Sequence, residues 1–102
     1  MKTKFVIQKY NENPLLVLGR KFDIRVWVLV TDWNPLIVWM YKDPYIRFAA
    51  NDFDLNDIEN KYSHLSNNTV SAECEEDEKP TGSTSHDIPE NMWTLLQFRS
   101  HL

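Results

Sequence analysis

This sequence has few of the residues that build covalent frameworks and phosphate-binding loops. It contains one cysteine and two glycines. A single cysteine, Cys74, excludes an intrachain disulfide framework and is typical of proteins in a reducing cytosol. The isolated Gly19 and Gly82 cannot form the glycine-rich loop that cradles phosphates in several nucleotide-binding folds. The sequence therefore excludes a disulfide-stapled scaffold and the common phosphate-loop motifs.

Long apolar segments are also missing. No segment approaches the roughly 18 consecutive apolar residues that a membrane span needs. The N-terminal Met1–Lys4 precedes only a short apolar stretch without a small-residue cleavage site, so we expect neither a signal peptide nor a membrane partner. With 102 residues, of which 42% are hydrophobic and 25% charged, the chain has the composition of at most one soluble globular domain.

Clusters typical of metal binding or nucleophilic catalysis are scarce. The segment from His64 to Asn68 offers an imidazole, a hydroxyl and two amides, but no second histidine or carboxylate lies at metal-binding spacing. The acidic run Glu73–Glu78 lacks the spacing and the glycine of a calcium loop. We therefore predict a capped loop at the first segment, a solvated loop at the second, and no metal site in either.

The charges that are present are unevenly distributed. Residues 1–50 carry eight Lys/Arg and four Asp/Glu, whereas residues 51–102 carry three Lys/Arg and eleven Asp/Glu, within a net charge of -4. The basic half suits an anionic partner. Nucleic acid is the weaker alternative, because the positive charges are dispersed and no known reading motif appears.

The first half has the composition and alternation of β-strands. Four segments combine β-branched or aromatic residues with breaks on either side. Asp32–Pro35 has turn chemistry and predicts a four-residue loop of an antiparallel hairpin. Gly19 is expected to end the short apolar stretch Leu15–Leu18. The predicted strands are Lys4–Tyr10, Ile24–Thr31, Leu36–Tyr41 and Tyr45–Ala49.

The second half predicts loops and short helices. Asp54–Asn60 is predicted to form a helical turn capped by Asp52 or Asp54. Residues 71–88 are acidic and then rich in Pro, Gly, Ser and Thr, so we expect a solvated, disordered insert. Pro89–Leu102 predicts a helix that Asp87 caps. Together the two halves indicate an α+β fold with an antiparallel sheet core.

Lys21–Arg25 is the segment with the clearest functional pattern. As a strand leading into Val26–Val30, it places Lys21, Asp23 and Arg25 on one face and apolar residues on the other. This charged face either binds an anionic ligand or meets solvent. Arg47 is likewise either a carboxylate clamp or an edge residue whose head reaches water, and the second is the commoner case.

Six short motifs, in order, make the sequence similar to a known family. They resemble the tubulin tyrosine ligase-like proteins, which are ATP-grasp ligases that add amino acids to tubulin. The ENPLL and TDWNPL motifs and PENMW (Pro89–Trp93) are most similar to the glycine-adding branch of that family. The six motifs are QKY (Gln8–Tyr10), ENPLL (Glu12–Leu16), GRKFDIR (Gly19–Arg25), VTDWNPL (Val30–Leu36), YIRF (Tyr45–Phe48) and HLSNN (His64–Asn68).

The resemblance implies roles for individual residues. Arg47 matches the arginine that grips the amino-acid substrate, Arg25 shares its charged face as a second catalytic cation, and Thr69 matches a further substrate contact. Threonine is more usual in the family at the position of Ser66. The residues implied in nucleotide binding are Gln8, Lys9, Tyr10, Asn11, Lys21, Phe22, Asp23, Ser66 and Asn67.

The resemblance also implies a reaction. ATP with Mg²⁺ would activate a glutamate side-chain carboxylate in a tubulin C-terminal tail, and the amine of free glycine would attack it. Such a protein acts in the cytoplasm and cytoskeleton, above all in the cilium. Alternatives are a glutamate ligase of the same family, a non-catalytic module that docks acidic tails, and a remnant that does not fold stably.

The match covers only the middle of an ATP-grasp site. Residues 1–70 correspond to the central part of the domain, residues 71–88 to an insert and residues 89–102 to part of a helix. The family's magnesium ligands and its phosphate-covering loop lie outside the matched segment. We therefore expect the 102 residues to be inactive in isolation.

Overall fold

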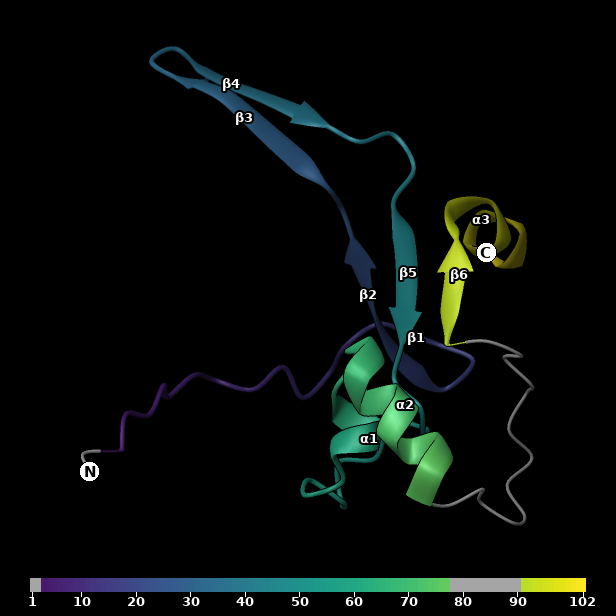
Figure 1. Ribbon diagram of the computed structural model, residues 1–102. Coiled ribbons are helices and arrows are strands. Elements are labelled where there is room, and N and C mark those ends of the chain that lie inside the picture. Colours follow the sequence, from purple (N-terminus) through teal and green to yellow (C-terminus); the bar gives the residue numbers. More distant parts are fainter. Residues whose placement is uncertain (1–2, 78–90) are drawn as a thin grey trace.

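The computed structural model describes residues 3–77 and 91–102. Within these ranges the chain forms two antiparallel sheets and a few short helices (Figure 1). This arrangement confirms the predicted mixture of antiparallel sheet and short helices. A four-stranded sheet has the order β1 (Leu16–Val17), β2 (Arg20–Arg25), β5 (Tyr45–Phe48), β6 (Met92–Thr94), and a two-stranded sheet pairs β3 (Val28–Trp33) with β4 (Leu36–Met40).

A tight turn joins β1 to β2. Leu18 and Gly19 both have positive φ, 52° and 74°. Two successive left-handed residues match the twist of a two-residue hairpin, which is why a glycine is useful here. A Cβ at Gly19 would meet nothing closer than Asp52 at 3.8 Å, so backbone conformation rather than space favours glycine. The predicted end of the apolar stretch at Gly19 is confirmed.

The predicted single strand Ile24–Thr31 is wrong, because the chain changes sheets inside it. β2 ends at Arg25 and pairs with β5, whereas β3 begins at Val28 and pairs with β4. Tyr41 N donates to Trp27 O at 2.8 Å at the base of the β3–β4 ladder. The apolar pattern continues from β2 into β3, so it does not indicate that the two strands have different pairing partners.

The loop of the β3–β4 hairpin is shorter than predicted. Asp32 and Trp33 belong to β3, and Trp33 pairs with Leu36, so only Asn34 and Pro35 connect the strands through a cis peptide bond. The turn chemistry is as expected, since Asn34 N donates to Asp32 Oδ1 at 3.1 Å. The predicted four-residue loop is therefore wrong, although its position is right.

The predicted strand Lys4–Tyr10 is also wrong. Residues 3–13 follow an extended course away from the sheets and pair with no strand of the described chain (Figure 1). Phe5, Val6 and Ile7 are 81%, 83% and 96% exposed. A strand needs a neighbouring ladder for its backbone hydrogen bonds, and alternation alone does not provide one.

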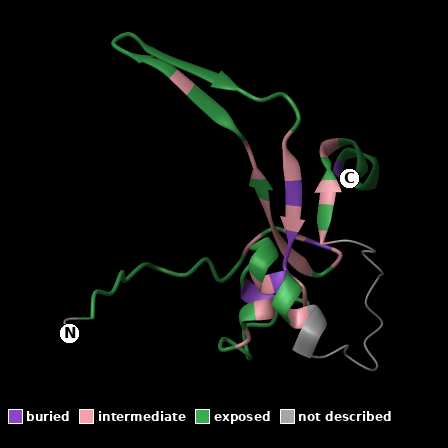
Figure 2. Cartoon of the chain, viewed as in Figure 1, coloured by how far each residue is buried: buried purple, intermediate pink, exposed green. Residues whose placement is uncertain are grey.

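The predicted strand Tyr45–Ala49 is confirmed as β5, one residue shorter. It pairs with β2 in a register that opposes Phe22 to Phe48 and Ile24 to Ile46. The core lies on this apolar face and is the only part of the sheets with fully buried large side chains among the described residues (Figure 2). Its buried members are Val17, Ile46, Phe48 and Phe98, with Leu18, Phe22 and Trp93 packed around them.

The helices of the second half are α1 (Lys61–His64) and α2 (Asn68–Asp77), and their bounds differ from the predicted helical turn and loop. The predicted helical turn Asp54–Asn60 is wrong, since Asp54 accepts from Asn56 N at 2.8 Å in a turn and Asn60 caps α1. The predicted loop is wrong over residues 71–77, which continue α2. Residues 78–88 of that prediction lie outside the described residues.

The predicted C-terminal helix begins later than expected. Residues 92–94 form β6, and α3 spans Leu95–His101. Thr94 is the cap: Gln97 N donates to Thr94 Oγ1, and Thr94 N donates back to Gln97 Oε1 at 2.8 Å. The predicted helix is therefore wrong over residues 92–94, whereas its start at Pro89 and the proposed cap Asp87 lie outside the described residues. No helix of the described ranges is long and apolar enough to span a membrane.

Candidate functional site

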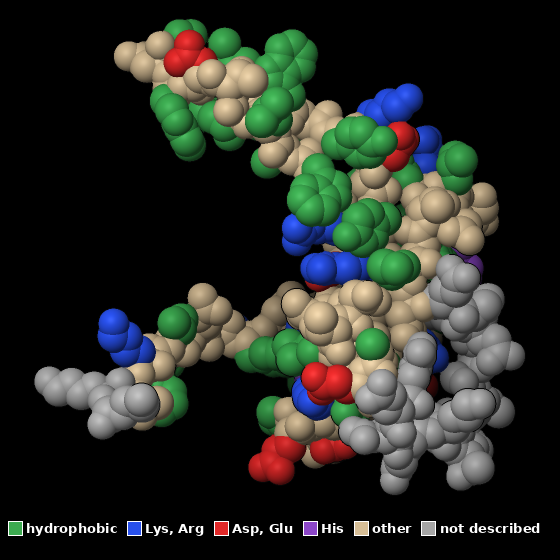
Figure 3. Space-filling model, in the orientation of Figure 1, with side chains coloured by type: hydrophobic (Ala, Val, Ile, Leu, Met, Phe, Trp, Pro, Cys, Tyr) green, Lys and Arg blue, Asp and Glu red, His purple; other side chains and the backbone are tan. Residues whose placement is uncertain are grey.

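The site is built on the face of β2 and β5 that lies opposite the core. Alternation along β2 turns Lys21, Asp23 and Arg25 away from Phe22, and the β2–β5 register sets Asp23 directly opposite Arg47. The predicted charged face therefore exists. Lys and Arg side chains gather below the projecting hairpin in the space-filling view, whereas hydrophobic side chains cover the hairpin itself (Figure 3).

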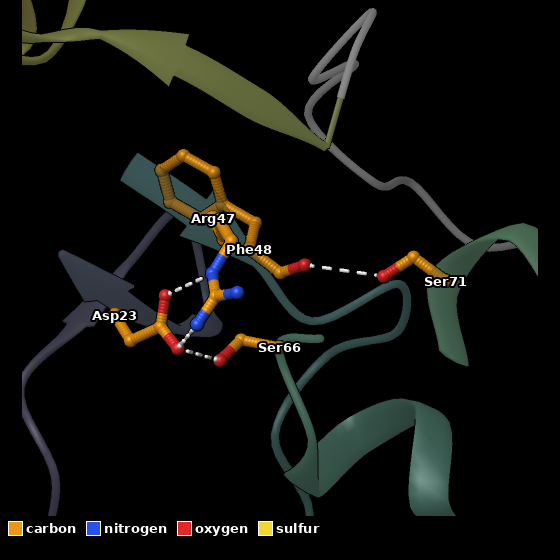
Figure 4. Close-up of polar contacts among 5 residues, drawn as sticks. All are labelled: Asp23, Arg47, Phe48, Ser66 and Ser71. Carbon is orange, nitrogen blue, oxygen red and sulfur yellow. Dashed lines mark hydrogen bonds and ion pairs between the residues drawn. The ribbon is translucent and has the colours of Figure 1, made fainter. Parts of the chain in front are cut away.

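Arg47 and Asp23 form a two-point ion pair. Arg47 Nε donates to Asp23 Oδ1 at 2.8 Å, and Nη2 donates to Oδ2 at 2.7 Å (Figure 4). Ser66, buried just after α1, donates its hydroxyl to Asp23 Oδ2 at 2.9 Å. Parallel N–H···O bonds of this kind fix the guanidinium plane as well as its position. Three elements thus meet at one carboxylate.

The pair changes the proton affinity of both groups. Partial burial raises the pKa of Asp23, but hydrogen bonds from Arg47 and Ser66, with the charges of Arg47 and Arg25, outweigh it and bring that pKa below its ordinary value. The hydrogen bond to Asp23 raises the pKa of Arg47. Both groups are therefore charged near neutral pH.

Lys21 and Arg25 flank this pair without a carboxylate partner among the described residues. Lys21 Nζ lies 5.0 Å from the ring centroid of Tyr10, and the Arg25 guanidinium lies 4.6 Å from the Trp27 ring. Arg25 Nε is buried and has no hydrogen-bond partner in the described chain. These two cations remain available to an anion.

Tyr10 ties the N-terminal segment to α1 through His64, a contact that the sequence did not reveal. His64 is buried, and its Nε2 lies 3.0 Å from the carbonyl oxygen of Asp57. A carbonyl only accepts, so Nε2 donates to it, and Nδ1 forms a hydrogen bond with Tyr10 Oη at 2.6 Å. The HLSNN motif was expected to be a capped loop. Its histidine instead packs between Tyr10 and Phe53.

Some predicted site residues lie apart from this cluster. Gln8, Lys9 and Asn11 are exposed in the extended segment, where Lys9 pairs with Glu12 at 3.3 Å. Lys9, Tyr10 and Asn11 help to line a shallow hollow of about 300 Å³. The structure therefore brings Tyr10, but not its neighbours, to the charged face.

Phe22, Asn67 and Thr69 also lie away from the cluster. The side chain of Phe22 lies on the core face, with ring centroids 5.2 Å from Phe98 and 6.0 Å from Phe48. This is the apolar face on which alternation placed it, and its implied role in nucleotide binding stays a prediction. Asn67 and Thr69 are exposed at the start of α2, where the carbonyl of Asn67 accepts from Ser71 N at 3.0 Å.

The described chain thus presents a paired Arg–Asp face with two flanking cations that have no carboxylate partner among the described residues. The sequence model of the Tubulin-tyrosine ligase family matches residues 1–102. The chain belongs to the tubulin-tyrosine ligase family, which confirms the resemblance drawn from the six motifs.

The similar proteins include tubulin glycylases and a probable tubulin polyglutamylase. The chain is similar to "Tubulin glycylase 3C" of Tetrahymena thermophila, at 56% identity over 76% of the chain and 7% of that protein. It is 46% identical to the human "Tubulin monoglycylase TTLL3" over 97% of the chain and 12% of the relative. It is 42% identical to the rat "Probable tubulin polyglutamylase TTLL9" over 96% of the chain and 20% of the relative. The chain thus spans a small part of each relative's length.

Proposed function

We propose that this chain forms part of the substrate cleft of an ATP-dependent carboxylate–amine ligase with an ATP-grasp fold. The ligase joins glycine to glutamate side chains in the C-terminal tails of tubulin. Family membership and the names of the glycylase relatives support the reaction class and the substrate. The tubulin substrate named for these relatives supports a ligase that acts on the cytoskeleton in the cytoplasm, and we extend the proposal to the cilium.

The observation that carries the proposal is the orientation of Arg47. A guanidinium has five N–H groups, and Asp23 takes one from Nε and one from Nη2. The other three lie on Nη1 and Nη2, and Nη1 points away from Asp23 in the close-up (Figure 4). This free edge has the geometry to bind the carboxylate of a free amino acid at two points.

The cations of the charged face suit the negative charge of a nucleoside triphosphate. Lys21 and Arg25 are cations without a carboxylate partner among the described residues, and the buried Arg25 Nε still needs an acceptor. When bound, ATP supplies the phosphoryl group that activates an acceptor carboxylate. Lys21 and Arg25 would hold negative charge at this face, and Tyr10 would keep the adjoining backbone segment beside Lys21.

The described residues do not fit Mg²⁺. They contain no group of three or more Asp, Glu, His or Cys side chains placed to hold a metal ion. Asp23, the carboxylate of the charged face, already accepts three hydrogen bonds from Arg47 and Ser66. We therefore derive no catalytic step from a metal bound to this part of the chain.

An assay of the complete protein that contains these residues tests the proposal. Purified protein is incubated with tubulin, ATP and labelled glycine, and incorporation into the tails is measured. We expect Arg47→Lys to lower kcat/KM about 100-fold, because an ammonium cannot replace a two-point guanidinium contact. Arg99→Lys, at an exposed position near the end of α3, is the matched control and should retain activity.

Two results would contradict the proposal. One is an unmodified complete protein that incorporates no amino acid into tubulin. The other is an Arg47→Lys protein as active as the Arg99→Lys control. A purified 102-residue chain that turns over would contradict the separate expectation that this segment is inactive in isolation.

A glutamate ligase is the second candidate function. The similarity to a probable polyglutamylase over 96% of the chain favours it. Glycine and glutamate share the carboxylate that Arg47 would bind, so the charged face does not discriminate between them. Parallel assays with labelled glycine and labelled glutamate decide this point.

A non-catalytic docking module would instead bind acidic tail peptides in a salt-sensitive and ATP-independent manner.

A further inference from the structure

The β3–β4 hairpin carries large apolar side chains on both of its faces. The register sets Leu29 opposite Trp39, and the neighbouring pair sets Val28 opposite Met40. Successive residues of a strand point to opposite faces, so these two pairs lie on opposite faces of the hairpin. The four side chains are between 59% and 70% exposed, and hydrophobic side chains cover the hairpin in the space-filling view (Figure 3). The described residues therefore leave both faces open to solvent.

The amino-acid pattern of the hairpin is typical of strands with two buried faces. Asp32 is the single charged residue between Val28 and Tyr41. A sheet with one face in water alternates apolar with polar residues, whereas strands covered on both faces have nearly continuous apolar runs. Leu36–Tyr41 consists entirely of hydrophobic residues and is such a run. The pattern thus predicts burial on both faces.

The edges and the base of the hairpin are open as well. β3 and β4 pair only with each other within the described residues, so the outer edge of each strand keeps unpaired backbone groups. A shallow hollow of about 320 Å³ is lined by Trp27, Val28, Leu29, Trp39, Met40 and Tyr41. A two-stranded hairpin alone is marginally stable in water, and burial of its apolar surface stabilises it.

The two open faces distinguish between possible occupants. A second copy docked about a two-fold axis would cover one face with the same face of its partner and leave the opposite face in water. An acidic peptide would find no cation on the hairpin strands, because Asp32 is their single charge. Separate elements of one longer polypeptide can cover both faces and pair with both edges. Such length is present in two glycylase relatives, of which this chain spans 7% and 12%.

We propose that both faces of the β3–β4 hairpin are docking surfaces for apolar elements of the same polypeptide, supplied by residues outside these 102. The hairpin then lies inside the complete protein, whereas the four-stranded sheet already has its own apolar core. The inference goes beyond the proposed function, because it concerns an intramolecular interface and holds whether the complete protein ligates glycine, ligates glutamate or only docks tails.

Hydroxyl-radical footprinting of the complete, unmodified protein tests the inference. Trp39 and Met40 are readily oxidised side chains that point to opposite faces, so a single peptide reports on both. We expect each to be oxidised about tenfold more slowly in the native protein than in urea, because burial withdraws it from solvent. Phe48, fully buried in the described chain, gives the rate of a buried ring in the same sample. Protection should persist on about 100-fold dilution and without tubulin, because an intramolecular contact does not depend on concentration.

Three results would overturn the inference. One is oxidation of Trp39 or Met40 in the native protein as fast as in urea, which means that one face stays open. Another is protection that disappears on dilution, which identifies a second copy as the occupant. The third is protection that appears only when microtubules are added, which identifies tubulin as the occupant. The footprint needs no turnover, so an inactive protein with both residues protected would contradict the proposed function and support this inference.

Discussion

The β2–β5 pair and the β3–β4 hairpin are both antiparallel ladders, and the chain runs directly from one to the other. In the first, β6 extends the ladder at the edge of β5, one face packs against α3, and the other face carries the Asp23–Arg47 pair. In the second, every residue but Val30 is exposed, although its two strands are more apolar in sequence than β2 and β5 (Figure 2). Hydrogen-bond ladders of one kind therefore support two regions with very different burial.

This difference shows where the stability of the described chain originates. Ladder hydrogen bonds largely exchange for bonds to water and contribute little net free energy. Burial of apolar surface contributes most of the stabilisation, and it occurs around Ile46, Phe48 and Phe98. We expect the four-stranded sheet to control the free energy of unfolding and the hairpin to add little.

Matched aromatic truncations give the largest expected contrast. Phe48→Ala removes a fully buried ring that contacts Trp93 at a centroid distance of 4.8 Å, and should cost about 3–5 kcal/mol of unfolding free energy. Trp39→Ala removes a larger ring that is 63% exposed on β4, and should cost about 0.5 kcal/mol. Denaturant unfolding followed by circular dichroism measures both. Equal costs would show that the hairpin carries as much of the stability as the sheet.

The ion pair on the charged face should give a smaller, pH-dependent contrast. The folded-state pKa of Asp23 lies below its ordinary value of 3.8, so the charged carboxylate stabilises the fold above about pH 4. That contribution is lost as the pH falls through the folded-state pKa. Because the Asp23 side chain is 39% exposed, solvent screening limits the expected cost of Asp23→Asn to about 1 kcal/mol near neutral pH.

This prediction is checked by measuring the unfolding of Asp23→Asn and of the unmodified chain from about pH 7, where the carboxylate is charged, down to about pH 2.5, below its ordinary pKa. The difference in free energy should be constant above about pH 5 and should vanish at the acidic end. Asp43→Asn, an exposed carboxylate between β4 and β5, is the control and should give no such trend. A constant difference at all pH values would show that Asp23 acts without its charge.

The smallest effect on the free energy of unfolding is expected at the contact between the extended N-terminal segment and α1. Tyr10→Phe removes the hydroxyl that is hydrogen-bonded to His64 Nδ1, and should cost about 0.5–1 kcal/mol and increase amide exchange in residues 3–13. Tyr41→Phe, on an exposed residue at the base of the hairpin, should leave exchange unchanged. Hydrogen–deuterium exchange followed by mass spectrometry measures both variants. Equal exchange in the two would show that the Tyr10–His64 contact does not hold the segment.

The sequence by itself determined the local features whose causes lie within a few residues. Charge alternation along Lys21–Arg25 set the charged face, the Asp32–Pro35 chemistry set the position of the hairpin turn, and Gly19 set the end of β1. Six ordered motifs also sufficed to name the family. Each of these depends on side-chain identity and spacing alone, and no distant contact is needed to read them.

The tertiary structure decided everything that depends on a partner. The same alternation is a strand in β2, where β5 supplies a ladder, and is no strand in Lys4–Tyr10, where the described chain supplies none. The change of sheet after Arg25 and the helix over residues 71–77 follow from pairing and packing that a linear pattern does not encode. Likewise, only the fold brings Asp23, Arg47 and Ser66 together, because hydrogen-bond geometry is set between elements that are far apart in the chain.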